Sequence, residues 1–126
     1  MLKQAGSQRI LLVEDEKLAQ KVHCYYLRKL GYEVHIASTG KEAVESSGET
    51  DFSAMVLDLG LPDMNGSKVL AEIRKREERT GRYLPVIVVT AHGDKNILTH
   101  LKRKKADFAF VKPVKFSDFT RSLQVL

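Results

Sequence analysis

The sequence predicts a single α/β domain in which helices cover both faces of a parallel β-sheet. Short runs rich in β-branched residues alternate with helical patterns along the chain, which is typical of parallel sheets. Three of these runs are almost entirely apolar, as expected for strands buried on both faces. The 126 residues, 43% of them hydrophobic, suffice for one core, and we expect no second catalytic or DNA-binding domain.

Five segments are predicted to be strands. The segment Glu33–Ala37 alternates polar and apolar residues, which indicates an edge strand with one exposed face. The predicted strands are Ile10–Val13, Glu33–Ala37, Ala54–Leu57, Val86–Val89 and Phe108–Val111. Their order along the chain, with helical segments between them, predicts a five-stranded doubly wound α/β unit.

Five helices are predicted between and after the strands. In the first, apolar residues at helical spacing indicate the buried face, and Gly31 is predicted to end the helix. That face is Leu18, Val22, Tyr26 and Leu30. The others are Lys41–Ser46 after Ser38 and Thr39, Ser67 to about Glu78 with Val69, Leu70 and Ile73 buried, Lys95–Arg103, and a last helix that buries Phe116, Phe119 and Leu123. Residues 1–8 are predicted to be frayed, and 9–126 to form the domain.

The chain is basic, with 21 Lys and Arg against 16 Asp and Glu, a net charge of +5 and a sequence pI near 9.4. The excess is concentrated in two clusters, Arg74-Lys75-Arg76 with Arg79 and Arg82, and Lys102 to Lys105. Both lie near the amino ends of predicted strands, and we interpret them as solvated faces suited to an acidic protein or a neighbouring domain. Because they lack interleaved aromatic residues and a helix-turn-helix pattern, we expect no direct nucleic-acid binding.

The sequence also limits the cellular context. No apolar run approaches the ~18 residues of a membrane span, and the amino terminus has no signal-peptide pattern. Because Cys24 is the only cysteine, an intramolecular disulfide is excluded, and Cys24 is predicted to be a packing residue of its helix. We therefore expect a cytoplasmic domain without membrane contact.

Polar residues follow four of the predicted strands. Glu14, Asp15 and Glu16 come after the first strand, Asp58 after the third, Thr90 after the fourth and Lys112 after the fifth. In an open parallel sheet the ligand crevice lies outside the carboxyl ends of the strands. We expect these side chains to converge there.

The chemistry of this set points to a hard cation and an anionic substrate. Two like charges about 4 Å apart repel by ~4 kcal/mol at an effective dielectric of 20, so Glu14, Asp15 and Asp58 need compensation. Their oxygen ligands suit Mg²⁺ rather than zinc. Lys112 and Thr90 add groups that stabilise an anion, which predicts phosphoryl transfer with the Asp58 carboxylate as nucleophile. No arrangement supports a serine or cysteine nucleophile.

Four short motifs, in order, resemble the receiver domains of two-component response regulators and hybrid sensor kinases. The resemblance extends from Arg9 to the carboxyl terminus. The motifs are Leu11-Leu12-Val13-Glu14-Asp15, the run from Val56 through Asp58 and Pro62 to Gly66, Val88-Val89-Thr90-Ala91, and Val111-Lys112-Pro113. The resemblance implies a flavodoxin-like doubly wound sheet with strand order 2-1-3-4-5.

The same resemblance implies roles for individual residues. Asp58 would accept a phosphoryl group from a phosphohistidine on a histidine kinase or a histidine phosphotransfer domain. Mg²⁺ would be bound by Asp15, Asp58 and the carbonyl group of Gly60, with Glu14 acting through a metal-bound water. Thr90 and Lys112 would hold phosphoryl oxygens, and the Lys112–Pro113 peptide would be cis. Self-phosphorylation and self-dephosphorylation would be the only catalysis of such a signalling domain.

The chain departs from the family pattern at four positions. Glu14 stands where aspartate is common, and Ala109 replaces the aromatic residue that usually rotates with the threonine, although Phe108 and Phe110 flank it. Gly60 offers no side chain to shield the acyl phosphate, and His92 is a candidate for controlling water access.

These departures leave alternatives open. Ala109 and the basic faces fit a receiver-like interaction module that acts independently of phosphorylation. A flavodoxin-type electron carrier is disfavoured, because Glu14, Asp15 and Glu16 would repel a flavin phosphate. The run from Leu59 to Met64 and the missing aromatic residue favour the receiver of a hybrid kinase, in which case the chain would be a cytosolic segment of a longer, membrane-bound protein.

Overall fold

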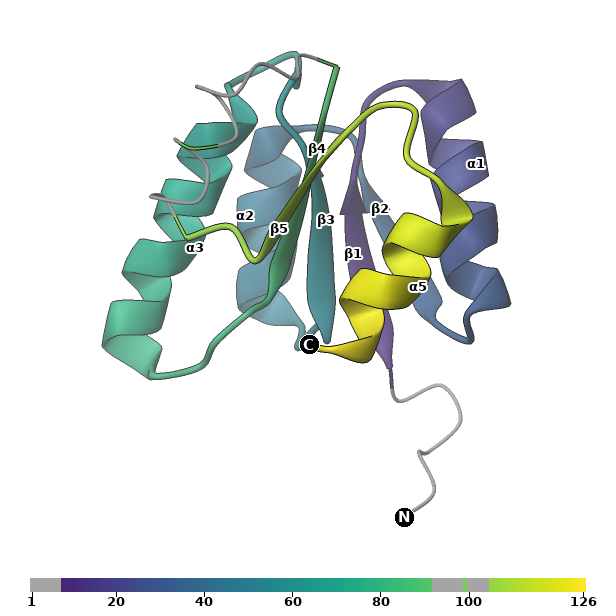
Figure 1. Ribbon diagram of the computed structural model, residues 1–126. Helices are drawn as coiled ribbons and strands as arrows, with labels where there is room; N and C mark the ends of the chain where they lie inside the picture. Colours follow the sequence, from purple (N-terminus) through teal and green to yellow (C-terminus); the bar gives the residue numbers. More distant parts are fainter. Residues whose placement is uncertain (1–7, 92–98, 100–104) are drawn as a thin grey trace.

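The structure, a computed structural model, describes residues 8–91, 99 and 105–126. Its five parallel strands form one sheet in the order β2-β1-β3-β4-β5, which confirms the predicted fold class and strand order (Figure 1). The strands are β1 (Arg9–Val13), β2 (Glu33–Ala37), β3 (Ala54–Asp58), β4 (Val86–Thr90) and β5 (Phe108–Val111). The described helices are α1 (Lys17–Lys29), α2 (Gly40–Glu49), α3 (Gly66–Thr80) and α5 (Phe116–Gln124).

Four predictions fall wholly or mainly outside the described residues. They are the helix over Lys95–Arg103, the role of His92, the solvated face formed by Lys102 to Lys105, of which Lys105 alone is described, and the frayed segment 1–8, of which residue 8 alone is described. Four of the five predicted helices are therefore tested by the structure, and all four are present.

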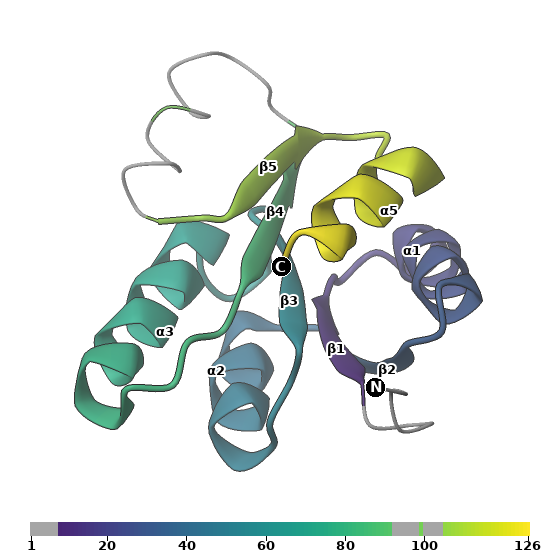
Figure 2. The same ribbon diagram turned by 60° about the horizontal axis from the view of Figure 1, so that its bottom comes forward.

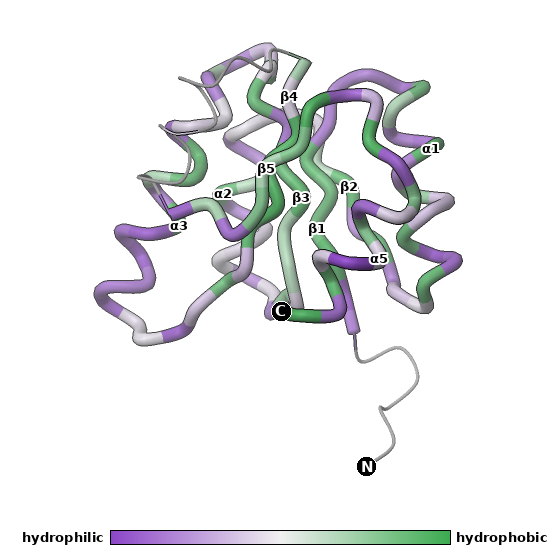
Figure 3. Tube along the Cα trace, viewed as in Figure 1, coloured by the Kyte–Doolittle hydropathy of each residue, from purple (hydrophilic) through white to green (hydrophobic). Residues whose placement is uncertain are grey.

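The helices form one layer on each face of the sheet. Helices α1 and α5 lie on one face, and α2 and α3 lie on the other (Figures 1 and 2). Side chains alternate between the two faces along each strand. In β1, for example, Leu11 and Val13 join the core beneath α2 and α3, whereas Ile10 and Leu12 join the core beneath α1 and α5. Figure 3 shows hydrophobic residues concentrated along the central strands.

The burial of the strands follows their place in the sheet. Nearly all residues of the central strands β1, β3 and β4 are buried. The outer strands β2 and β5 remain partly exposed, which confirms the predicted edge position of Glu33–Ala37. Among the described residues, no helix is long and apolar enough to cross a membrane.

Local sequence signals set several helix ends. The Thr39 side chain caps α2 by accepting a hydrogen bond from the amide of Glu42 at 3.1 Å, as predicted. Gly31 follows Leu30, the C-cap residue of α1, with a φ of 97°, and Gly81 ends α3 with a φ of 71°, conformations that favour glycine.

Helix α2 runs to Glu49 and is longer than the predicted Lys41–Ser46. Ser47 and Gly48 are weak helix formers, so local preference alone suggests an earlier end. The guanidinium group of Arg76 in α3 donates to the Val44 carbonyl oxygen at 2.8 Å and to Ser47 Oγ at 2.9 Å. This tertiary contact is made to the last turns of α2, and the local sequence gives no sign of it.

The predicted buried face of α1 is wrong for two of its four residues, since Tyr26 and Leu30 do pack against the core beneath α1 and α5. Leu18 and Val22 are 69% and 38% exposed, although they have helical spacing with Tyr26 and Leu30. The helix instead buries Gln20, His23, Cys24 and Leu27, which confirms the packing role predicted for Cys24. The apolar stripe was misleading because buried polar residues carry part of the real interface. Two apolar side chains of α1 are thereby left at the surface.

The first basic cluster is not simply a solvated face. The Arg74 side chain is 11% exposed, and its guanidinium forms ion pairs with Glu77 at 2.8 Å and Asp107 at 3.1 Å. It also donates to the carbonyl oxygens of Leu84 and Lys105. One guanidinium therefore joins α3 to the segments that enter β4 and β5, a geometry that suits the planar, multiple donors of arginine.

We expect Arg74→Ala to lower the free energy of unfolding by about 2–4 kcal/mol, because it leaves two partly buried carboxylates and two carbonyl groups without their donor. Arg79→Ala is the matched control, since Arg79 is exposed on the same helix and such changes cost about 0.5 kcal/mol or less. Urea denaturation measures both. Equal effects of the two changes would contradict the assigned role of Arg74.

His23 is the buried polar residue at the contact between α1 and α5. It is 4% exposed and meets the Phe119 ring edge-on at a centroid distance of 5.5 Å. Its Nδ1 has no hydrogen-bond partner among the described residues. Burial, helped by the positive charge of Lys112, lowers the pKa of His23 to about 4. The imidazole is thus neutral at neutral pH.

This pKa makes the fold sensitive to mild acid. Protonation favours the unfolded chain, so the stability linked to neutral His23 is complete above the ordinary histidine pKa of about 6.5 and is lost as the pH falls towards 4. We expect the wild type to lose about 1–2 kcal/mol more than His23→Leu between about pH 7 and pH 5. Urea denaturation at the two pH values tests this, and parallel losses would exclude a buried neutral imidazole.

Candidate functional site

Strand register brings the predicted carboxylates together at the carboxyl edge of the sheet. Val13 of β1 pairs with Leu57 of β3, so the next residues, Glu14 and Asp58, are neighbours. Asp15 follows at the start of the connection to α1. Each of the three residues offers a carboxylate oxygen, and these oxygens lie within 4.8 Å of one another.

Lys112 supplies a positive charge to this cluster, as the sequence predicts. Its Nζ donates to Glu14 Oε1 at 2.9 Å and approaches Asp58 Oδ2 at 3.3 Å. The backbone amide of Lys112 donates to the Thr90 carbonyl oxygen at 2.8 Å, and the Lys112–Pro113 peptide is cis, as the resemblance implies. The lysine that follows β5 thus reaches carboxylates that follow β1 and end β3.

Burial makes these charges interdependent. Glu14 is 1% exposed, and burial raises its pKa although Lys112 and the amide of Glu16 donate hydrogen bonds to its carboxylate. Burial works to lower the pKa of Lys112, but the hydrogen bond to Glu14 and the negative charges of Asp58 and Glu14 raise it on balance. The ammonium group therefore stays charged and offsets part of the repulsion between carboxylates.

The loop after Asp58 is held by its own backbone. The Gly60 amide donates to Asp58 Oδ1 at 3.2 Å, and the Gly66 amide donates to the Leu59 carbonyl oxygen at 2.9 Å. Asn65 pairs with Gly60 in an antiparallel bridge and caps α3 through the amide of Ser67. The first turn of α3 is thereby held against the strand end that carries Asp58.

Two residues that sequence reasoning missed connect the site to its surroundings. The side chain of buried Gln20 donates from Nε2 to the Glu14 carbonyl oxygen at 2.6 Å and to Ser38 Oγ at 3.3 Å. The Asp63 carboxylate accepts hydrogen bonds from the amides of Gly40 and Lys41 at 2.8 and 3.0 Å. These bonds to backbone amides lower the pKa of Asp63.

Neither role has a clear local signal in the sequence. For Gln20 the available signal was a polar residue four positions before Cys24 and seven before Leu27, on the face that proves to be buried. For Asp63 the available signal was an acidic residue in the loop after Asp58. Asp63 lies near the amino end of α2 only in the folded structure. Both residues position loops that border the carboxylates.

The site residues line an open cavity of about 510 Å³. Glu14, Asp15, Asp58, Gly60, Thr90 and Lys112 all border it, so every predicted catalytic and metal-binding residue lies in one place. Cys24 is not among the residues that line it. Carboxylate oxygens without a nearby thiol are the ligands that Mg²⁺ prefers. The donor set therefore fits Mg²⁺ and an anionic group that Lys112 can hold.

The phenylalanines beside Ala109 cannot replace the missing aromatic residue at that position. Ala109 packs against the core beneath α2 and α3, the face on which alternation also places Thr90. Phe108 and Phe110 pack against the opposite core and stack on each other, with ring centroids 6.2 Å apart. The sheet itself separates these rings from the Thr90 side chain.

The family model for the response regulator receiver domain matches residues 10–124. The chain belongs to this family. Receivers are phosphoacceptor signalling domains of two-component systems, whose partners are histidine kinases or phosphotransfer domains. The family thus accounts for the conjunction of acidic residues, threonine and lysine at this edge of the sheet.

Named relatives place this receiver within the family. It is 34% identical over 107 residues to the transcriptional regulatory protein SrrA of Staphylococcus aureus, covering 85% of this chain and 42% of SrrA. The chain therefore spans less than half of that relative.

Solved receiver structures extend the comparison. The receiver domain of the sensor histidine kinase PA1611 from Pseudomonas aeruginosa PAO1 is 35% identical, with a TM-score of 0.84 and coverage of 96% of this chain and 97% of that one. That structure holds a magnesium ion in its active-site cleft. A CheY-like receiver from Methanospirillum hungatei JF-1 is 28% identical, with a TM-score of 0.80 and coverage of 94% and 91%.

Gly66 is packed so closely against the end of β3 that a side chain has no room there. A Cβ atom there would lie 2.6 Å from the Asp58 carbonyl oxygen and 2.7 Å from Leu59 Cα, distances that the backbone cannot accept without moving. We expect Gly66→Ala to destabilise the fold by about 1–3 kcal/mol.

Gly48→Ala in α2 is the control for Gly66→Ala. Its added Cβ meets the end of the Arg76 side chain at 3.3 Å rather than backbone, and alanine is the better helix former. Thermal unfolding should show a smaller effect at Gly48, within about 1 kcal/mol of the wild type. A larger loss at Gly48 than at Gly66 would refute the close-approach argument.

Proposed function

We propose that this receiver accepts a phosphoryl group on Asp58 from a phosphohistidine and thereby changes the surface that it presents. The observation that carries the proposal is the convergence of Asp58 with Glu14, Asp15 and Lys112 in one open cavity. Asp58 as a residue is 6% exposed but borders that cavity, so a small phosphodonor group has access to it.

The residues divide the chemistry among them. Asp58 Oδ forms the new bond to phosphorus as the phosphorus–nitrogen bond of the donor breaks, and the released imidazole takes up a proton. Lys112 releases Asp58 and holds a phosphoryl oxygen together with Thr90. Asp15, Asp58 and the Gly60 carbonyl group would hold Mg²⁺, with Glu14 acting through water, and the ion would supply positive charge that neutralises the transferring group.

The same residues support the receiver's own turnover. Small phosphodonors such as acetyl phosphate fit the same in-line transfer, and water attack on the acyl phosphate regenerates the Asp58 carboxylate and releases phosphate. Gly60 places no side chain over the phosphoryl position, so access of water is not restricted from that residue.

An apolar groove beside the site supports docking of a histidine-bearing partner. Leu18, Val22 and Tyr26 of α1 line a cavity of about 390 Å³ together with Lys112 and Pro113. A helix presenting a phosphohistidine next to apolar side chains would cover Leu18 and Val22 and bring its imidazole to the cavity mouth.

We also propose that the chain is the receiver of a hybrid sensor kinase, located in the cytoplasm. The resemblance of the run from Leu59 to Met64, the absence of an aromatic residue at Ala109, and the 35% identity to the PA1611 receiver support this context. The phosphorylation-independent alternative rested on Ala109 and the basic faces. The convergence of the acidic residues with Lys112 favours the phosphoacceptor instead.

Replacing the phosphoacceptor tests the main proposal. With Mg²⁺ and acetyl phosphate, intact-protein mass spectrometry should show one added phosphoryl group on the wild type and none on Asp58→Asn, because the amide is not a nucleophile. Asp63→Asn is the matched control: Asp63 lies in the same loop, but its carboxylate caps α2, so this variant should still be phosphorylated. Phosphorylation of Asp58→Asn at the wild-type level would refute the assignment.

Asp15 provides a test of the metal site without loss of a buried ion pair, because it is exposed. We expect Mg²⁺ to raise the melting temperature of the wild type, and Asp15→Asn to bind Mg²⁺ at least about tenfold more weakly. Glu16→Gln removes the same charge from the adjacent exposed residue and should retain the response. If both variants respond alike, Asp15 is not a ligand.

A further inference from the structure

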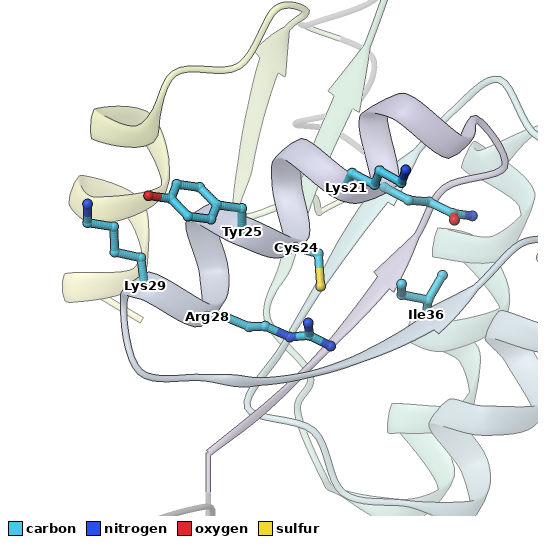
Figure 4. Close-up of a pocket in the computed structure, with 7 residues that line it drawn as sticks. Lys21, Cys24, Tyr25, Arg28, Lys29 and Ile36 are labelled. Carbon is cyan, nitrogen blue, oxygen red and sulfur yellow. The ribbon is translucent and has the colours of Figure 1, made fainter.

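A second, open groove lies between α1 and the edge strand β2, on the flank of α1 away from Lys112. Its volume is about 730 Å³. Gln20, Lys21, Cys24, Tyr25, Arg28, Lys29 and Ile36 line it, and all but Gln20 are labelled in Figure 4. Apart from the packing of Cys24 and the hydrogen bond from Gln20 to the Glu14 carbonyl oxygen, these residues belong to none of the roles assigned above.

The groove exists because α1 does not cover the edge of the sheet. Ile36 lies two residues after Val34, on the same face of β2, and Val34 packs against the core beneath α1 and α5. Ile36 nevertheless remains 43% exposed, since the buried face of α1 is directed to the sheet interior. An apolar side chain is therefore left at the floor of the groove, next to the nearly buried Cys24.

The rim of the groove is cationic. Lys21 and Arg28 are two turns apart on α1, and Lys29 lies with its Nζ 5.7 Å from the centre of the Tyr25 ring. None of the ion pairs found among the described residues includes these three cations. No carboxylate lines the groove. Arg74, by contrast, has its charge compensated within the domain.

We propose that this groove binds an acidic segment of a partner protein. An apolar side chain of that segment would lie over Ile36 and Cys24, while carboxylates on either side would meet Lys21 and Arg28. Because the positive charge of the groove is uncompensated, the partner segment has to be negatively charged. Because the floor between the cations is apolar, the segment also needs an apolar side chain to cover it.

A protein segment fits better than a nucleic acid. The Tyr25 ring is 62% exposed, but Lys29 lies over it, and single-stranded nucleic acids depend on rings that are free to stack with bases. The apolar floor also offers nothing to a phosphate backbone. The groove is separate from the phosphoacceptor, because Val22 and Tyr26 face the Lys112 side of α1, whereas Lys21 and Arg28 face β2.

The test uses a fluorescein-labelled peptide of glutamates flanking a central leucine, with binding followed by anisotropy. We expect the double charge reversal Lys21→Glu/Arg28→Glu to weaken binding at least about tenfold, and Ile36→Ser to weaken it as well. Added salt should weaken binding to the wild type. In ¹⁵N-labelled protein, the peptide should shift amide resonances of α1 and β2.

The matched control is Lys41→Glu/Lys68→Glu, which makes the same charge change at exposed lysines of α2 and α3. It should bind the peptide within about threefold of the wild type, allowing for the change in net charge. Asp58→Asn should bind as the wild type does, which separates this groove from the proposed phosphoacceptor. Circular dichroism melts confirm that each variant is folded.

Four outcomes would overturn the proposal. Three are equal losses in the groove and control variants, resonance shifts away from α1 and β2, and no measurable binding to the wild type. The fourth is a labelled single-stranded DNA that binds the groove more tightly than the peptide, since the partner would then be a nucleic acid.

Discussion

The interaction on which this receiver depends is the contact of one ammonium group with two carboxylates at the carboxyl edge of the sheet. Parallel strands place Glu14 and Asp58 side by side, and their mutual repulsion would weaken the fold without a nearby positive charge. Lys112 supplies that charge from a third strand. The stability of this edge and its chemistry are therefore set by the same three side chains.

Contacts around the cluster explain how its geometry is maintained. Gln20 holds the backbone of Glu14 from α1, Asp63 holds the loop after Asp58 against α2, and Gly66 lets α3 begin within contact distance of β3. Helices on both faces thus touch the loops that carry the site. A phosphoryl group that draws Lys112 away from Glu14 would change the charge balance of the cluster that these contacts surround.

Three faces of helix α1 have different surroundings, and residues of all three alternate along its sequence. Its buried face packs His23 and Leu27 into the core, one flank presents Val22 beside the phosphoacceptor cavity, and the other presents Lys21 and Arg28 above β2. The two proposed partners would therefore meet opposite flanks of one helix. Charge and apolar surface are distributed so that the two flanks favour different chemistry.

The sequence by itself determined the fold class, the five strands, the edge position of β2 and the set of residues that converge at the carboxyl edge of the sheet. Strand alternation, capping residues and motifs at strand ends are local patterns. They can be recognised in the sequence without knowing which segments pack against them. Glu14, Asp15, Asp58, Thr90 and Lys112 could be selected because chain topology alone brings strand ends together.

Only the tertiary structure decided which face of α1 is buried, that Arg74 and Arg76 serve the fold, and that Gln20 and Asp63 support the site. Each of these depends on polar groups that meet partners distant in sequence, such as the Arg74 guanidinium and Asp107. Hydropathy treats such residues as surface residues, because it records the cost of burying a polar group but not the hydrogen bonds that offset that cost. Those bonds exist only once the chain is folded.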